Sequence, residues 1–141
     1  MANTGVPSEK KFDQHFRKLG GFVYAFEDAK QLFGKNKRAV ANDAKPCDRM
    51  VVLKGTTFWA EIKSTENKTS FPFGIIKTDQ LGYARQIIRA DGQYLFFVHS
   101  LHLDKWFRIP AALVIERILY GTKSFKWTEL QDMGVEIAVN G

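Results

Sequence analysis

The run QYLFFVH at residues 93–99 restricts the fold more than any other segment, because nearly all of its side chains are apolar. A strand of this composition is expected to be buried on both faces of a sheet. A helix is predicted just before it, with an apolar stripe made by Leu81, Ala84, Ile87 and Ile88. The chain is therefore expected to pack helices against a central sheet.

Capping, turn and periodicity signals place the other elements around that strand. Ser8 is expected to cap a first helix that ends at Gly20–Gly21, and Pro110 to open a later helix that runs to Tyr120. Further strands are expected at residues 22–26, 50–53, 57–62 and 105–109. The predicted order is helix, strand, hairpin, helix, strand and then additions, which makes an α/β fold with a central mixed sheet flanked by helices.

The 141 residues are expected to form one domain. Residues 1–7 are predicted to be a flexible tail, residues 8–110 the core, and residues 111–141 C-terminal additions. No apolar run approaches the roughly 18 residues of a membrane span, and the N-terminus lacks the apolar region of a signal peptide. The single cysteine, Cys47, excludes a disulfide framework and a Cys-cluster zinc site. We expect a cytoplasmic protein with no membrane partner.

The charge of the chain indicates the kind of partner. There are 21 Lys and Arg residues against 15 Asp and Glu residues, and the net charge of +6 favours a polyanion. Residues 30–45 hold five basic residues and one acidic residue, so five minus one, or +4, lies in this stretch. By itself the stretch fits either phosphate contacts or a solvated loop.

A predicted hairpin brings two carboxylates together. If Lys54–Gly55 is its two-residue turn, residues whose numbers add up to 109 face each other, so Asp48 lies opposite Glu61 with Cβ atoms about 5 Å apart. Like charges at that distance need compensation, and a divalent cation such as Mg²⁺ or Mn²⁺ supplies it. Lys63 follows Glu61 by two residues and therefore shares its face of the strand.

The alternative interpretation is an edge hairpin whose charged side chains face solvent. The neighbours argue against it, because Met50, Val52 and Trp59 share the face of the carboxylates and make it largely apolar. A helix is expected to cover such a face, and charged groups at its end then need a function.

The segment Pro46-Cys47-Asp48, the hairpin turn and Glu61-Ile62-Lys63 together resemble the PD-(D/E)XK nuclease motif. The continuation Ser64-Thr65-Glu66-Asn67-Lys68-Thr69-Ser70-Phe71-Pro72 is more specific and resembles the RecU-type Holliday junction resolvases. A glutamine-bearing helix and an apolar strand follow, as in that family. The likeness covers about residues 8–110, and a looser one links the chain to the archaeal Hjc resolvases.

This resemblance implies a PD-(D/E)XK restriction-endonuclease-like core and roles for individual residues. It implies that Asp48, Glu61 and the Ile62 carbonyl hold Mg²⁺, for which Mn²⁺ substitutes. Lys63 would orient or polarise the attacking water, and Gln80 would support the site from its helix. The family also places an acidic residue on the first helix. Asp13 matches it best, and Glu9, one turn away, is the open alternative.

Next to such a motif, basic side chains are expected to contact DNA phosphates. The candidates are Lys35, Lys37, Arg38, Lys68, Lys77 and Arg85. For Arg85 a solvated position on its helix is the equal alternative.

The resemblance implies a Mg²⁺-dependent endodeoxyribonuclease, with no small-molecule cofactor, that resolves four-way (Holliday) junctions by paired symmetric cuts leaving 5′-phosphate ends. Branched DNA and a second copy of the chain in a homodimer are the expected partners. The short N-terminal arm suggests a compact, phage-borne version acting in a bacterial cytoplasm. Two alternatives remain: another PD-(D/E)XK nuclease, of the restriction or the recombination and repair type, or a basic DNA-binding module with an inactive site.

Overall fold

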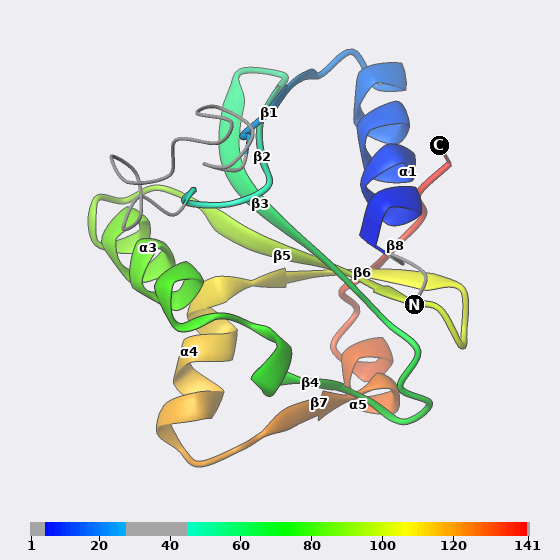
Figure 1. Ribbon diagram of the computed structural model, residues 1–141, viewed down its shortest axis with the longest axis vertical. Coiled ribbons are helices and arrows are strands. Elements are labelled where there is room, and N and C mark those ends of the chain that lie inside the picture. Colours follow the sequence, from blue (N-terminus) through cyan, green and yellow to red (C-terminus); the bar gives the residue numbers. More distant parts are fainter. Residues whose placement is uncertain (1–4, 28–44, 141) are drawn as a thin grey trace, which may run out of the picture.

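A computed structural model describes residues 5–27 and 45–140 of the chain (Figure 1). Within these ranges six strands form a mixed sheet in the order β1-β2-β3-β5-β6-β8, and two short strands, β4 and β7, pair separately. The strands are β1 (Phe22–Ala25), β2 (Arg49–Leu53), β3 (Thr56–Thr65), β4 (Ser70–Pro72), β5 (Tyr94–Ser100), β6 (Lys105–Pro110), β7 (Ser124–Lys126) and β8 (Glu136–Ile137). The helices are α1 (Gly5–Lys18), the 3₁₀ turn η2 (Phe73–Ile75), α3 (Thr78–Arg89), α4 (Ala111–Leu119) and α5 (Trp127–Asp132). The predicted α/β fold with a central mixed sheet is confirmed.

The strand β5 lies inside the sheet, as its composition predicts. All seven of its residues are buried, and it pairs with β3 in parallel and with β6 antiparallel. Side chains alternate across a strand, so β5 supplies both faces of the sheet. Phe97 belongs to the core under α1, whereas Phe96 belongs to the core under α3 and α4. Figure 1 shows α1 on one side of the sheet and α3 with α4 on the other.

Aromatic contacts attach α1 to the sheet. The rings of Phe12 and Phe97 meet edge to face with centroids 4.9 Å apart, and Phe16 packs against both Phe58 and Phe97. Edge-to-face pairs at such distances are favoured by the quadrupoles of the rings. The helical spacing of Phe12 and Phe16 therefore does set the buried side of α1.

The first helix begins earlier than Ser8. It starts at Gly5, so the predicted tail over residues 1–7 is wrong for residues 5–7, and residues 1–4 lie outside the described part of the chain. Pro7 fits the first turn because its missing N–H would have had no partner there. Ser8 does not cap the helix: it is buried, and its Oγ lies 2.9 Å from Nδ1 of His99.

The hairpin of β2 and β3 has the predicted turn and register. Lys54 and Gly55 have φ angles of 52° and 81°, the pair of positive values that a type I′ turn requires. The ladder runs from Leu53 opposite Thr56 to Arg49 opposite Ala60. Glycine takes such a φ without a steric penalty, and the lysine adopts it because the turn imposes it.

The C-terminal residues are part of the fold and not an appendage. The strand β8 joins the sheet beside β6, and β7 pairs with β4, a short strand in the segment that follows β3. Trp127 and Leu130 are buried in the core under α3 and α4. The indole N–H of Trp127 also donates to the carbonyl of Asn67 at 3.0 Å. The loop after β3 is therefore held by residues some 60 positions later.

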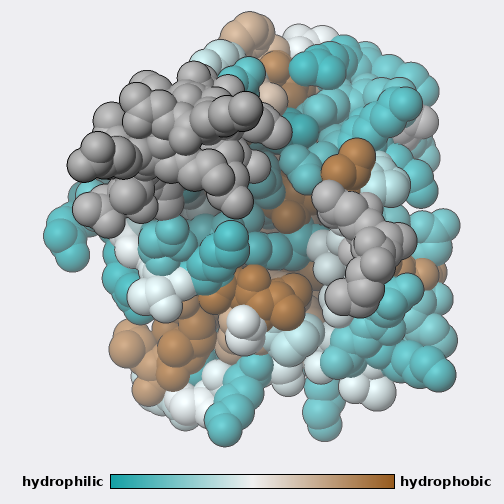
Figure 2. Space-filling model, viewed as in Figure 1, coloured by the Kyte–Doolittle hydropathy of each residue, from teal (hydrophilic) through white to brown (hydrophobic). Residues whose placement is uncertain are grey.

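The surface is mixed in character. In the view of Figure 2, hydrophilic side chains cover most of the coloured surface, and apolar side chains gather around α4. At the end of α4, Leu119 is 78% exposed and Tyr120 is 82% exposed. In the part of the chain that the structure describes, no helix combines the length and apolar character needed to cross a bilayer.

Replacing Leu130 by alanine should test whether the C-terminal residues belong to the core. Leu130 is fully buried, so the cavity should lower the free energy of unfolding by about 2–5 kcal/mol. Met133, which lies one turn further along and is 37% exposed, is the control. Met133→Ala should change the free energy of unfolding by less than about 0.5 kcal/mol. Urea unfolding measures both. Equal small effects would show that residues 124–137 are an independent addition.

Candidate active site

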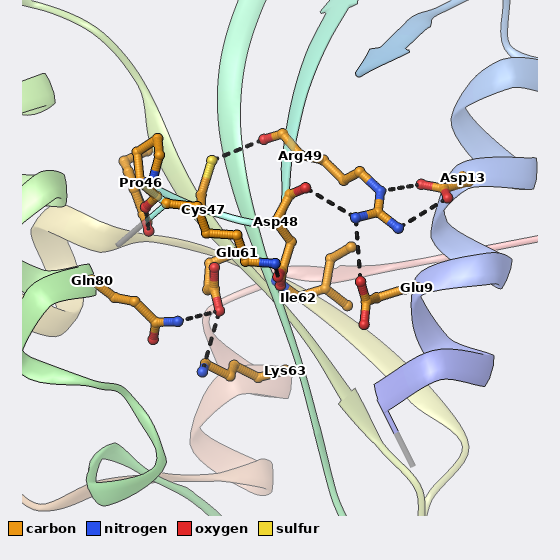
Figure 3. A network of polar contacts seen from close by, with 12 residues as sticks. Glu9, Asp13, Pro46, Cys47, Asp48, Arg49, Glu61, Ile62, Lys63 and Gln80 are labelled. Carbon is orange, nitrogen blue, oxygen red and sulfur yellow. Dashed lines mark hydrogen bonds and ion pairs between the residues drawn. The ribbon is translucent and has the colours of Figure 1, made fainter. Parts of the chain in front are cut away.

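Asp48 and Glu61 lie where the hairpin ladder ends (Figure 3). One step beyond the last pair, Arg49 with Ala60, the register sets Asp48 opposite Glu61. From here β3 continues without β2, and the backbone N–H of Ile62 donates to Oδ2 of Asp48 at 2.9 Å. The carboxylate thus replaces the missing strand partner. Both side chains are buried, with Asp48 8% and Glu61 2% exposed.

The two oxygens of Glu61 differ. Oε2 accepts a hydrogen bond from Nε2 of Gln80 at 2.7 Å and lies 3.2 Å from the ammonium of Lys63. Oε1 is buried and has no hydrogen-bond partner among the described residues. A buried carboxylate oxygen left without a partner is costly unless a further ligand binds it.

The environment of Glu61 favours its neutral form. Burial, and then the charge of Asp48, raises the pKa of Glu61 from 4.5 to about 7. The charge and hydrogen bond of Lys63 oppose this shift. A cation beside both carboxylates would restore the ionised form.

Gln80 reaches the site from the first turn of α3. Its Oε1 accepts the backbone N–H of Lys77 at 3.1 Å, which caps the helix, and this leaves Nε2 to face Glu61. One amide therefore ties the start of α3 to the carboxylate. The N-cap of α3 is Lys77.

The segment before β2 is fixed from two sides. The phenol of Tyr94 donates to the carbonyl of Pro46 at 2.7 Å, and the thiol of Cys47 donates to the carbonyl of Arg49 at 3.0 Å. Burial, followed by the charge of Glu61, raises the pKa of Cys47 to about 12, so the thiol stays protonated. Cys47 is thus a packed side chain and not a nucleophile.

Arg49 connects α1 to the start of β2. Its Nε and Nη2 donate to the two oxygens of Asp13 at 2.7 and 3.1 Å, and its Nη1 lies 3.2 Å from Oε1 of Glu9. The same Nη1 donates to the backbone carbonyl of Asp48 at 2.9 Å. Burial alone would lower the pKa of Arg49, but Asp13 and Glu9 raise it above its usual range. The guanidinium therefore remains charged and holds the helix against the site strand.

The two acidic residues of α1 have different surroundings. Both oxygens of Asp13 are held by Arg49, so the structure does not bring Asp13 to the carboxylate pair, and its catalytic role stays a prediction. Glu9, in contrast, is affected by the charge of Asp48. Burial, and then the charge of Asp48, raises the pKa of Glu9, while Arg49 and Lys45 oppose the shift.

The residues present fit a hard divalent cation. Asp48 and Glu61 provide carboxylate oxygens, one of them the buried Oε1, which has no partner within residues 5–27 and 45–140. The N–H and C=O of one strand residue point the same way, so the Ile62 carbonyl faces the side of Asp48 as its N–H does. In residues 5–27 and 45–140 no cluster of three or more His, Cys, Asp or Glu side chains is arranged for a metal. Water would fill the other positions, as is usual for Mg²⁺.

The predicted DNA contacts fall into two groups. Lys35, Lys37 and Arg38 lie outside the described residues. Lys68, Lys77 and Arg85 are exposed, on the loop after β3, at the N-cap of α3 and on α3 itself.

Three residues of this network are not among the sequence-based candidates: Lys45, Arg49 and Tyr94. Lys45 forms an ion pair with Oδ1 of Asp48 at 3.1 Å. Its position three residues before Asp48 was a usable signal. Glu9 and Asp13, one helical turn apart, were a signal for a shared cation such as Arg49. Tyr94 lies in an apolar strand, and nothing nearby in the sequence points to Pro46.

Comparison with known structures defines the fold. The chain is similar to Hjc from Archaeoglobus fulgidus, a Holliday junction resolvase from an archaeal hyperthermophile whose structure is known at 1.6 Å, with a TM-score of 0.57 and 12% identity. The match covers 97% of this chain and 93% of that one. The structure of a VRR_NUC domain is also similar, with a TM-score of 0.49 and 18% identity over 82% of this chain and 97% of that one. The fold is thus that of the Hjc resolvase.

The sequence profile of the RecU family (recombination protein U) matches residues 23–141, more than half of the chain. The chain therefore belongs to the RecU Holliday junction resolvase family. The match extends through β8 to the C-terminus, beyond the likeness at residues 8–110, and it leaves α1 outside. No curated protein sequence matches the chain.

Replacing Arg49 should test its structural role. Arg49→Ala leaves two carboxylates without their partner, so the free energy of unfolding should fall by about 2–4 kcal/mol, and Arg49→Lys should lose less. Lys105→Ala is the control, because its ion pair with Glu136 is 3.8 Å long and 41% exposed on both sides, and it should cost under about 0.5 kcal/mol. Thermal and urea unfolding measure these values. Equal effects of the two alanine variants would show that Arg49 does not stabilise the packing of α1 against β2.

Glu61→Gln should stabilise the metal-free protein above pH 7. The folded-state pKa is raised, so between pH 4.5 and about 7 the native state holds a proton that the unfolded state releases. Stability therefore falls as pH rises through this window of about 2.5 units, by at most about 3.5 kcal/mol, since each pKa unit is worth about 1.4 kcal/mol. The variant should be more stable than the wild type above pH 7 and equal to it near pH 4.5. Urea unfolding in the presence of a chelator measures this, and a gain that is the same at both pH values would contradict it.

Proposed function

We propose that this chain is a Mg²⁺-dependent endodeoxyribonuclease that resolves four-way DNA junctions by two symmetric cuts. One observation carries the proposal: the buried, opposed carboxylates Asp48 and Glu61, in a domain of the RecU family. Oε1 of Glu61 has no partner in the described part of the chain, and Lys63 lies beside the other oxygen, Oε2. A basic chain suits a phosphate backbone as partner. The structurally similar Hjc is a Holliday junction resolvase, which favours the same substrate.

Asp48, Glu61 and the Ile62 carbonyl would hold the cation. When bound, Mg²⁺ supplies Lewis acidity toward the scissile phosphate and its attacking water. The chain contributes a fixed set of donors. The Ile62 N–H sets the direction of the Asp48 carboxylate, and Gln80 sets that of Glu61. Neither carboxylate has to reorganise when the substrate arrives, which is the advantage of a preorganised site.

Lys63 would act on the reacting atoms. Its ammonium lies on the same face as Glu61 and the side chain is 14% exposed, so it has access to a phosphate placed over the carboxylates. There it orients the attacking water and offsets the negative charge that develops on the phosphate. Attack in line with the leaving group breaks the P–O3′ bond and leaves a 5′-phosphate and a 3′-hydroxyl. The oxygen of the attacking water forms the new P–O bond and loses its proton to solvent, and the leaving O3′ takes up a proton from solvent.

Two cuts in one junction require two sites. The described part of each chain holds one such opposed carboxylate pair, so a C2 homodimer that separates two copies of the site is the simplest arrangement. The exposed apolar side chains of Leu119 and Tyr120 are the kind of surface that such a contact buries. Recognition would then depend on branch shape and phosphate positions rather than on base edges.

Cleavage of an end-labelled four-way junction, compared with linear duplex, a nicked duplex and a three-way branch, tests the proposal. With Mg²⁺ the four-way junction should be cut at least about tenfold faster than the duplex, and chelator should stop cleavage. Asp48→Asn should reduce cleavage by a factor of about 10³ or more while leaving junction binding within about threefold, because only a charge is removed.

Different results would identify different errors. Equal rates on junction and duplex would point to another nuclease of this fold. Cleavage in the presence of chelator would contradict the requirement for a metal ion. Undiminished cutting by Asp48→Asn would contradict a catalytic role for that carboxylate. No cleavage of any substrate would favour a DNA-binding module. In mixtures of wild type with Asp48→Asn, mixed dimers should nick one strand of the junction, and complete resolution by them would contradict one site per chain.

A further inference from the structure

Lys45 lies just ahead of the carboxylate pair, and the proposed mechanism gives it no role. Its ammonium is 3.1 Å from Oδ1 of Asp48, and the side chain is 25% exposed. The other oxygen, Oδ2, accepts the backbone N–H of Ile62. Both oxygens of Asp48 therefore have partners, whereas Glu61 keeps Oε1 without one among the described residues.

The two lysines of the site differ in which carboxylate oxygens they leave available to a cation. Lys63 lies against Oε2 of Glu61, the oxygen that Gln80 also binds, so it can stay there when a cation binds Oε1. Lys45 occupies the oxygen of Asp48 that Ile62 does not use. A divalent cation that binds Asp48 meets this ammonium at close range, and the two positive charges repel each other.

The ammonium of Lys45 also acts on carboxylates of other elements. Its charge lowers the pKa of Glu61 on β3 and of Glu9 on α1, against the larger effect of burial. It therefore contacts Asp48 directly and is within electrostatic reach of two further carboxylates, those of Glu61 and Glu9. A point surrounded in this way is where a cation is most stable.

The backbone at Lys45 is held while its head group can move. The carbonyl of the next residue, Pro46, accepts the Tyr94 hydroxyl at 2.7 Å, which fixes the chain at this point. A lysine side chain carries a compact ammonium on a flexible four-carbon stem. The charge can therefore shift by several ångströms while the backbone stays in place.

We propose that Lys45 is a second active-site lysine. In the metal-free protein its ammonium is the counter-ion of Asp48; a divalent cation displaces it, and it then contacts a non-bridging oxygen of the scissile phosphate. The first half concerns this chain and its cation alone. The second half rests on the proposed nuclease function.

Calcium titration without DNA tests the displacement, because Ca²⁺ takes oxygen ligands and binding is read by calorimetry. Lys45→Met removes the competing charge, so Ca²⁺ should bind about three- to tenfold more tightly than to the wild type. Lys45→Arg keeps the charge and should stay close to the wild type. Lys123→Met, an exposed lysine on the loop before β7, is the control for net charge and should change affinity by less than about twofold. Unchanged or weaker binding by Lys45→Met would overturn the displacement.

Single-turnover cleavage at saturating Mg²⁺ tests the phosphate contact. Lys45→Met should slow cleavage by about 10- to 100-fold while junction affinity changes by less than about threefold, and Lys45→Arg should recover part of the rate. A wild-type rate in Lys45→Met would overturn the contact. If the wild type cuts no DNA, the proposed function and the phosphate contact fail together. The calcium titration then still decides whether Lys45 competes for Asp48.

Thermal unfolding of each variant checks that it is folded. Lys45→Gln gives a second neutral variant, so a defect peculiar to methionine does not decide the result. It should show the same tighter Ca²⁺ binding and slower cleavage as Lys45→Met, and wild-type values in both measurements would overturn the proposal.

Discussion

The hydrogen bond from the Ile62 N–H to Oδ2 of Asp48 is the contact on which the site depends. It forms where β2 has ended and β3 still presents backbone groups that need partners. A side-chain carboxylate satisfies that need only if it sits at the next position of the hairpin register. The same bond that completes the ladder therefore turns Asp48 toward Glu61. A slip of one residue in the register would move Asp48 to the other face of the sheet.

Charge balance around this contact explains why so many ionic residues are buried together. Asp48 and Glu61 repel each other, and Lys45 and Lys63 each stand beside one of them. On the other side of the sheet Arg49 is matched by Asp13 and Glu9. Breaking such a network by removing one member is more harmful than never forming it. The arrangement leaves one buried oxygen, Oε1 of Glu61, to be satisfied by something that the described part of the chain does not supply.

Local sequence was enough for features that depend on neighbouring residues. The Lys54–Gly55 turn specified the hairpin register, and this in turn placed Asp48 opposite Glu61. The apolar composition of β5 indicated a strand inside the sheet. The start of α1 was misjudged because Ser8 is a good N-cap by composition but is used against His99, 91 residues away. Arg49 and Tyr94 were missed for a similar reason: their partners on α1 and at Pro46 are set by how the helix and the strands pack, which no local pattern encodes. The roles of the site residues in cleavage stay predictions.

The divided amide of Gln80 has a consequence for the motions of this protein. Its oxygen closes the first turn of α3 and its nitrogen binds Glu61, so the helix start and the carboxylate share one side chain. The backbone N–H of Lys77 is protected from solvent deuterium only while that amide is in place. Its exchange rate therefore reports, from outside the site, how often the Gln80 amide leaves its place, while the Lys63 ammonium remains beside Oε2 of Glu61.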